Sequence, residues 1–144
     1  MLVQQILKSK ATDGVFTIKP GTSVADAASV LSNNRIGSVV VSATGDTAEG
    51  ILSERDIVRE LGKRGVSCMT DKVDDMMTKS LVTCELGDKA DDILETMTNG
   101  RFRHMPVIEN DKMVGLITLG DVVKSRLTEL SMEKEALEGM IMGH

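Results

Sequence analysis

Apolar positions change their spacing along the chain in a fixed order, and the order occurs twice. Ser38–Val41 is a continuous, largely β-branched run, which is typical of a strand buried on both faces. Before it, Val24, Ala27, Ala28 and Leu31 recur at the spacing of one helix face. Each half of the chain therefore predicts a strand, a helix, two strands and a second helix. We expect these at 15–18, 23–34, 38–41, 48–52 and 53–63, and again at 81–84, 88–99, 105–108, 113–117 and from 118 onward.

Residues that favour helix starts and turns separate these elements. Side-chain oxygens are expected to cap the helices that begin at Ser23, Ser53, Asp88 and Thr118. Two helices are expected outside the repeated order: a lead-in helix at about 2–8 and a short one near 71–77, within a linker at 64–80.

The last helical segment, 118–142, is long for a single repeat. Its apolar positions form a stripe, with charged residues outside it. The stripe consists of Leu127, Leu130, Leu137 and Met140. Two interpretations stay open: the helix mediates dimer contacts, or it lies exposed on its own module.

The two sets of elements form an internal sequence repeat, in which residues 15–58 match residues 81–123. The offset is 66 up to the loop at 43–49 and 65 beyond it, and one gap in a loop is readily tolerated. Identical pairs include Thr17 with Thr83, Gly21 with Gly87, Arg35 with Arg101, Gly50 with Gly115 and Asp56 with Asp121.

One unit of three strands and two helices leaves a face of its sheet uncovered, and a second copy can cover it. We therefore predict an α/β (α+β) fold of two repeats about a pseudo-twofold axis, each with a three-stranded sheet and two helices, plus a long C-terminal helix. Two equivalent clefts are expected between the repeats. The predicted domains are 1–63 with the lead-in helix, the linker 64–80, and 81–144 with the extended helix.

Composition excludes several classes of function. The net charge of −5 and the presence of only two aromatic residues argue against nucleic-acid binding. Two cysteines and two histidines offer neither a disulfide framework nor a metal site. No apolar run approaches the roughly 20 residues of a membrane span. No signal peptide is evident, so a cytoplasmic protein that does not bind membranes is expected.

A [Ser/Thr]-x-x-Asp motif begins the closing helix of both repeats, as Ser53–Asp56 and Thr118–Asp121. Such a motif can simply cap the helix. Alternatively, the carboxylate accepts hydrogen bonds from the two neighbouring hydroxyls of a ribose, since it offers two acceptor oxygens. The hydroxyls of Ser53 and Thr118, with the N–H groups of the helix start, would then face a phosphate. Its occurrence at both equivalent positions favours the ribose interpretation, and both roles can coexist.

The segments SVVV–GILSERDIV at 38–58 and RHMPVI–GLITLGDVV at 103–123 resemble the signature of the CBS domain, the module named after cystathionine β-synthase. The resemblance covers about residues 2–127, and it is closer to small stand-alone bacterial proteins made of a CBS pair. It implies a regulatory module that binds an adenine nucleotide, with AMP first and ADP, ATP or NAD(H) as alternatives. It also implies a homodimer, and a regulated protein would be a separate chain.

The resemblance places the adenine at the turn before the middle strand of each repeat. Neither turn is ideal, because Val40 stands where the second repeat has Pro106, and Arg103 stands where the first has Gly37. Arg55 and the cluster around Arg101 suit phosphate neutralisation, although surface ion pairs are the alternative for arginines. The expected ligand-binding residues are Thr17, Gly37, Ser38, Val39, Ser53, Arg55, Asp56, Thr83, Arg101, Arg103, His104, Met105, Pro106, Thr118 and Asp121.

No nucleophile–base pair, metal constellation or Gly-rich phosphate loop is recognisable, so we expect a protein that is not an enzyme. Two other functions remain: an interaction or scaffold protein with vestigial clefts, and a nucleotide-processing enzyme.

Overall fold

The chain forms two compact units, each built around one repeat, in a computed structural model that describes residues 1–10 and 14–141. The first-repeat unit contains residues 14–82 and the short segment 110–114. The second-repeat unit contains the described residues of the N-terminal segment together with 83–109 and 115–141. Each unit has its own hydrophobic core.

The first-repeat unit follows the predicted order of elements. They are β1 (Thr17–Ile18), α2 (Val24–Asn34), β2 (Ser38–Val41), β3 (Gly50–Ser53), α3 (Glu54–Arg64), a 3₁₀ helix (Gly65–Thr70) and α4 (Val73–Met76). In the three-stranded sheet, β2 is parallel to β1 and antiparallel to β3. All four residues of β2 are buried, as expected for a β-branched central strand. Ser23 and Ser53 cap α2 and α3 with their hydroxyls, which confirms both predicted caps.

The second-repeat unit contains α1 (Val3–Ser9), α5 (Ala90–Gly100), β4 (His104–Glu109), α6 (Leu119–Ile141) and, from residue 115 onward, β5 (Lys112–Thr118). β4 and β5 form a two-stranded sheet, and Asn110 and Asp111 between them adopt the left-handed conformation of a tight turn. The Thr118 hydroxyl accepts the Asp121 N–H and caps α6, as predicted. The fold is thus the predicted mixed α/β fold with two repeats.

The predicted strand at 81–84 is wrong, because only Cys84 pairs, in a single parallel bridge with Val107. Pro106 explains the difference. The equivalent residue of the first repeat, Val40, donates its N–H to the Phe16 carbonyl and so extends the pairing of β1 with β2. Proline has no N–H to donate, so the second sheet keeps two strands.

The predicted cap at Asp88 is also wrong, because α5 begins later, at Ala90. The Asp88 carboxylate accepts the Glu85 N–H over 2.8 Å and so closes the turn before the helix instead.

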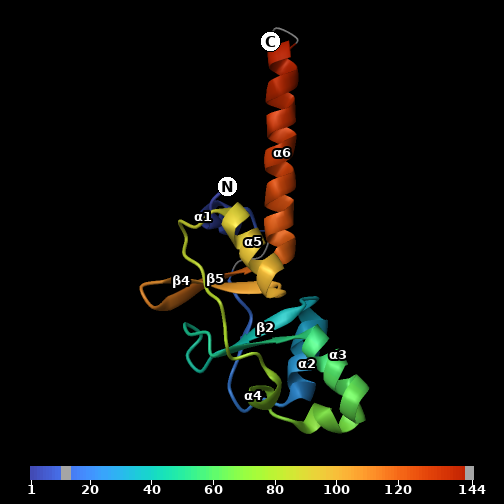
Figure 1. Ribbon diagram of the computed structural model, residues 1–144. Helices are drawn as coiled ribbons and strands as arrows, with labels where there is room; N and C mark the ends of the chain where they lie inside the picture. The colour runs from blue at the N-terminus through green and yellow to red at the C-terminus, as the bar shows by residue number, and fades with distance from the viewer. Residues whose placement is uncertain (11–13, 142–144) are drawn as a thin grey trace. The chain divides into compact units, whose positions relative to one another are not determined.

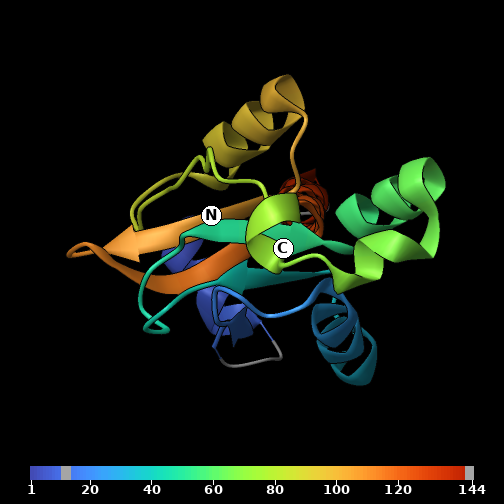
Figure 2. The same ribbon diagram turned by 90° about the horizontal axis from the view of Figure 1, so that it is seen from below.

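Each unit contains a lead-in helix in the same place, α4 in the first-repeat unit and α1 in the second. The Val73 N–H donates to the Thr22 carbonyl over 2.8 Å, and the Val3 N–H donates to the Asp88 carbonyl over 2.9 Å. Thr22 and Asp88 are equivalent residues of the repeat. α4 lies beside β3 (Figure 2), and α1 contributes Val3 to the core of the second-repeat unit. The predicted lead-in helix at 2–8 therefore joins the second-repeat unit. The domain limits set from the sequence stay a prediction.

The duplicated glycines, Gly50 and Gly115, make room for these lead-in segments. A Cβ at Gly115 would lie 2.8 Å from the Leu7 side chain, and a Cβ at Gly50 would collide with the Met77 side chain. The same close approach explains why both repeats have glycine at this position.

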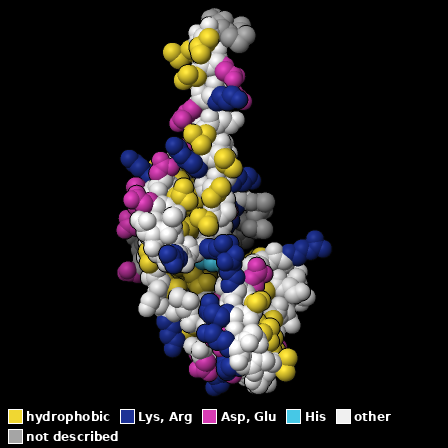
Figure 3. All heavy atoms as spheres, turned by 45° about the vertical axis from the view of Figure 1, so that its right-hand side comes forward, with side chains coloured by type: hydrophobic (Ala, Val, Ile, Leu, Met, Phe, Trp, Pro, Cys, Tyr) yellow, Lys and Arg dark blue, Asp and Glu magenta, His cyan; other side chains and the backbone are white. Residues whose placement is uncertain are grey.

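α6 is 23 residues long and extends beyond α1 and α5 of its own unit (Figure 1). Only Val122 and Ser125 are buried, whereas hydrophobic side chains lie exposed along its far part (Figure 3). The predicted helix included residue 142, which lies outside the described residues. A search of the described helices for one long and apolar enough to cross a membrane finds none.

Candidate functional site

The turn before the middle strand and the start of the closing helix are joined in both units by equivalent hydrogen bonds. The Glu54 N–H donates to the Gly37 carbonyl over 2.9 Å, and the Leu119 N–H donates to the Arg103 carbonyl over 2.8 Å. Each bond uses an N–H that the helix itself leaves without a partner. Two segments that the sequence predicted to share a site are therefore adjacent within each unit.

In the first-repeat unit, Asp56 is a buried carboxylate with both oxygens engaged. Oδ2 accepts the N–H and the hydroxyl of Ser53, each over 3.0 Å. Oδ1 accepts an N–H of Arg59 over 2.7 Å, in an ion pair along α3. With the Ser53 hydroxyl accepting the Asp56 N–H, these contacts complete a capping box. The cap is therefore formed, and a ribose hydroxyl would have to share an oxygen that already accepts a hydrogen bond.

In the second-repeat unit, Asp121 has a different environment. Its Oδ2 accepts the Thr118 N–H over 2.9 Å and the Lys10 ammonium over 2.8 Å. The same ammonium donates to the Leu116 carbonyl over 2.9 Å, so Lys10 fastens the end of α1 to β5 and α6. Within the described part of the chain, nothing donates a hydrogen bond to Oδ1. The side chain is 22% exposed, compared with 12% for Asp56. As far as residues 1–10 and 14–141 are concerned, Oδ1 is thus available to a ligand.

Arg35 and Arg101 both adopt the left-handed conformation, with φ of 52° and 56°, directly after α2 and α5. Glycine usually occupies this position, because a side chain costs about 1–2 kcal/mol there. The equivalent strain at both positions places an arginine at the start of each candidate adenine turn, a pattern that favours a functional role for the side chains.

The arginines of the candidate site form no ion pairs with residues 1–10 or 14–141. This holds for Arg35, Arg55, Arg101 and Arg103, which are all exposed. The alternative of surface ion-pair partners therefore finds no support in the described residues. His104 begins β4 and is half-buried.

Several predicted site residues have side chains that are committed to the core. Val39 and Met105 are 0% and 1% exposed and belong to the two core clusters. Ser38 and Pro106 are also buried in their strands. A ligand would meet these four through their backbone. Thr17 pairs with Val40 in the sheet.

Thr83, the equivalent of Thr17, is exposed and precedes the Cys84 bridge. Lys10 was missed by the sequence analysis, since no pattern in the sequence joins it to Asp121.

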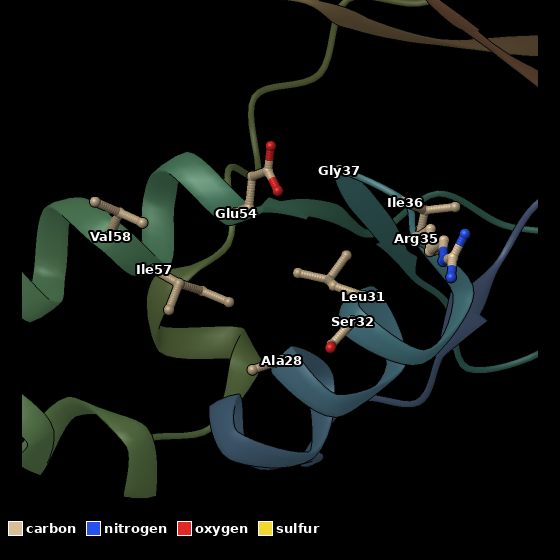
Figure 4. A pocket seen from close by; sticks show the side chains of 9 residues that line it. All are labelled: Ala28, Leu31, Ser32, Arg35, Ile36, Gly37, Glu54, Ile57 and Val58. Carbon is tan, nitrogen blue, oxygen red and sulfur yellow. The ribbon is translucent and has the colours of Figure 1, made fainter.

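A pocket of about 510 Å³ lies between α2 and α3 in the first-repeat unit. The side chains of Leu31 and Ile57 point toward each other across it (Figure 4). It is lined by Ala28, Leu31, Ser32, Arg35, Ile36, Gly37, Glu54, Ile57 and Val58. Ser53 and Asp56 do not line it, so this pocket is separate from the carboxylate of the candidate ribose site.

Comparison with known proteins matches this arrangement to one family. A profile of the CBS domain matches residues 3–63 and 73–128. Among curated proteins, the mitochondrial CBS domain-containing protein CBSX3 of Arabidopsis thaliana is 33% identical over 141 residues, which cover 94% of this chain and 68% of the relative.

Solved structures agree in fold. The CBS-domain containing protein ATU1752 from Agrobacterium tumefaciens superposes with a TM-score of 0.82 and is 40% identical, covering 88% of this chain and 99% of that chain. The CBS domain pair of protein MJ0100, in complex with 5′-methylthioadenosine and S-adenosyl-L-methionine, superposes with a TM-score of 0.75 at 22% identity, covering 91% of this chain and 98% of that chain. The two profile matches begin with α1 and with α4, the two equivalent lead-in helices. The chain belongs to the CBS domain family and contains two copies of the domain.

Proposed function

We propose that this CBS pair is a non-catalytic regulatory module that binds an adenosine 5′-phosphate, with AMP as the first candidate. Asp121 accepts a ribose hydroxyl, and the arginines of the adjoining turn bind the phosphate. CBS pairs are regulatory modules, and the complex of MJ0100 supports an adenosine-containing ligand. ADP, ATP and NAD(H) carry the same adenosine group and are alternative ligands.

The available oxygen of Asp121 is the observation that carries the proposal. Oδ2 is fixed by the Thr118 N–H and the Lys10 ammonium, which hold the carboxylate in one orientation. Oδ1 can then accept a hydroxyl without breaking either bond. The hydrogen bond to a charged acceptor favours ribose over a sugar that lacks the hydroxyl.

Arg101 and Arg103 supply the charge for a phosphate. Both are exposed, both lie in the turn bonded to the start of α6, and neither forms an ion pair within the described residues. A guanidinium without an ion-pair partner can bind a phosphate with two parallel hydrogen bonds. AMP should therefore bind more tightly than adenosine, which has the same ribose and base.

Thermal unfolding with a panel of ligands tests this function. A ligand that binds only the folded state raises the unfolding temperature with its concentration. We expect AMP at millimolar concentration to raise it, adenosine to raise it less, and deoxyadenosine, which lacks one of the two hydroxyls, to raise it least. Glu133→Gln, which changes an exposed carboxylate elsewhere on α6, should respond as the unchanged chain does. No shift with any adenosine compound would contradict the proposal.

The second candidate function is an interaction protein whose ligand sites are vestigial. The first site supports it, because the carboxylate of Asp56 already accepts hydrogen bonds from the protein. Ser53 and Arg59 already use both of its oxygens. Stoichiometry separates the two cases. A regulatory module whose first site is vestigial binds one AMP per chain, whereas an interaction protein with two vestigial sites binds none. A protein purified without added nucleotide that shows adenine absorbance would favour the regulatory module. The chain contains no Trp or Tyr to obscure that absorbance.

A further inference from the structure

Beyond its first turns, α6 makes no contact with the other described residues that explains its length. Val122 and Ser125 are buried, and Glu129 pairs with the N-terminal amino group of Met1 and with Arg126. From residue 130 to residue 141, every residue except Gly139 is exposed. An isolated helix of this length is marginal in water, so its stability calls for a partner.

The exposed face of α6 carries a stripe of mainly apolar residues with the spacing of a coiled coil. The α6 stripe advances by alternate steps of four and three residues and is interrupted by a single lysine. It consists of Val123, Leu127, Leu130, Lys134, Leu137 and Ile141. Its apolar members are 41–79% exposed.

The α6 stripe and the fold-facing residues occupy opposite sides of the helix. Val122, Ser125 and Glu129 are spaced by three and four residues and form one face against their own unit. The stripe lies about half a turn away from that face. A second helix can therefore lie along the stripe without displacing the contacts of α6 with its own unit.

We infer that the α6 stripe pairs with the same stripe of a second copy of this chain in an antiparallel coiled coil. The spacings between successive stripe residues are four, three, four, three and four, which is the same sequence from either end of the helix. In one antiparallel register, every stripe residue therefore faces a stripe residue of the second copy. In that register Val123 faces Ile141 of the second copy, Leu127 faces Leu137, and Leu130 faces Lys134. Twofold symmetry doubles each of these contacts.

The charges beside the stripe favour this orientation over the parallel one. Antiparallel pairing brings Lys124 next to Glu138 of the second copy, twice by symmetry, and brings one like-charge pair together, Glu133 with its copy. Parallel pairing would bring Glu133 next to Glu138 twice and stack Lys134 on its own copy. Like charges at such positions select against a pairing.

Sedimentation velocity on the whole chain tests this pairing. The unchanged chain should sediment as a dimer at micromolar concentration. Leu137→Glu places a charge in the stripe and should give a monomer. Met132→Glu is the matched control, because Met132 is 61% exposed and Leu137 is 59% exposed, but Met132 lies off the stripe. This control should remain a dimer. Both side chains are exposed, so both variants should keep the unfolding temperature of the core.

Disulfide cross-linking tests the orientation. Leu127→Cys and Leu137→Cys chains produced together should cross-link under mild oxidation. Leu137→Cys alone should not, because its two copies lie about 15 Å apart along the antiparallel pair. The two native cysteines, Cys68 and Cys84, are buried, and the unchanged chain provides the baseline. A monomeric unchanged chain, or a dimer that persists in Leu137→Glu, would overturn the inference. Efficient cross-linking of Leu137→Cys alone would overturn the antiparallel arrangement. None of these outcomes depends on nucleotide binding.

Discussion

Lys10 and Asp121 form an ion pair of 2.8 Å, although 111 residues separate them in the chain. Lys10 lies at the end of α1, and Asp121 lies in the first turn of α6. Asp56, the equivalent of Asp121, pairs instead with Arg59 of its own helix. The carboxylate of one motif thus pairs with a distant segment of the chain, and that of the other motif pairs within its own helix. The two candidate sites therefore differ in their hydrogen bonds.

Lys10→Met should destabilise the second-repeat unit. It removes the ion pair with Asp121 and the hydrogen bond to the Leu116 carbonyl, and both partner side chains of the ion pair are about three-quarters buried. We expect the free energy of unfolding to fall by about 1–2 kcal/mol in urea denaturation. Lys8→Met changes another lysine of α1 that forms no ion pair with the described residues, and it should have a smaller effect. Equal effects of the two changes would contradict the role of Lys10.

Arg101→Gly should stabilise the fold and weaken phosphate binding together. Glycine adopts a φ of 56° without the strain that a side chain causes there, so the free energy of unfolding should rise by about 1 kcal/mol. Arg101→Ala keeps the strain and should not stabilise. Both variants lose the guanidinium, so both should bind AMP more weakly and adenosine equally well. Unimpaired AMP binding by both would remove Arg101 from the site.

Gly115→Ala should destabilise the packing of α1. The added Cβ would lie 2.8 Å from the Leu7 side chain, and overpacking of this kind costs about 1–3 kcal/mol. Gly62→Ala is a control of opposite sign, since no neighbouring atom lies within 4 Å and alanine favours α3. Chemical denaturation of both variants compares them directly. If the Gly115→Ala chain were as stable as the unchanged one, the prediction would be wrong, because the Leu7 side chain would then move aside without cost.

Cys84 should make the fold less stable in alkaline solution. Burial raises the pKa of its thiol from 9.0 to about 12, with a smaller contribution from Asp88. Between these values the unfolded chain has lost the thiol proton and the folded chain keeps it, so stability falls as pH rises. The loss is on the order of 1 kcal/mol per pH unit.

The matched variant for this pH dependence is Cys84→Ala, which has no thiol to titrate. Comparison of the two chains between pH 8.5 and 10 isolates the contribution of Cys84, because other groups titrate equally in both. Parallel stability curves would show that the thiol ionises in the folded chain as easily as in the unfolded one.

Local signals in the sequence predicted most of the fold. The β-branched run of β2 and the hydroxyl caps at Ser23, Ser53 and Thr118 act over a few residues, and the structure confirms them. The strand expected at 81–84 failed for a distant reason, since Pro106 removes the N–H that would extend it.

The electrostatics of the candidate site were beyond sequence reasoning. The motif indicated two equivalent carboxylates, but their partners depend on tertiary contacts such as the one that brings Lys10 to Asp121. The left-handed conformation of Arg35 and Arg101 was equally hidden, because arginine carries no signal for it. The repeat nevertheless identified these positions as equivalent, and the structure gives them the same backbone conformation.

Isothermal titration of AMP into the unchanged chain, Asp121→Asn and Asp56→Asn tests the central claim most directly. Among the described residues nothing donates to Oδ1 of Asp121, whereas both oxygens of Asp56 already accept hydrogen bonds, so Asp121→Asn should weaken the binding of AMP at least tenfold. Asp56→Asn should change it little and should mainly lower stability. Unchanged affinity in Asp121→Asn, or no binding by the unchanged chain at millimolar AMP, would contradict the account.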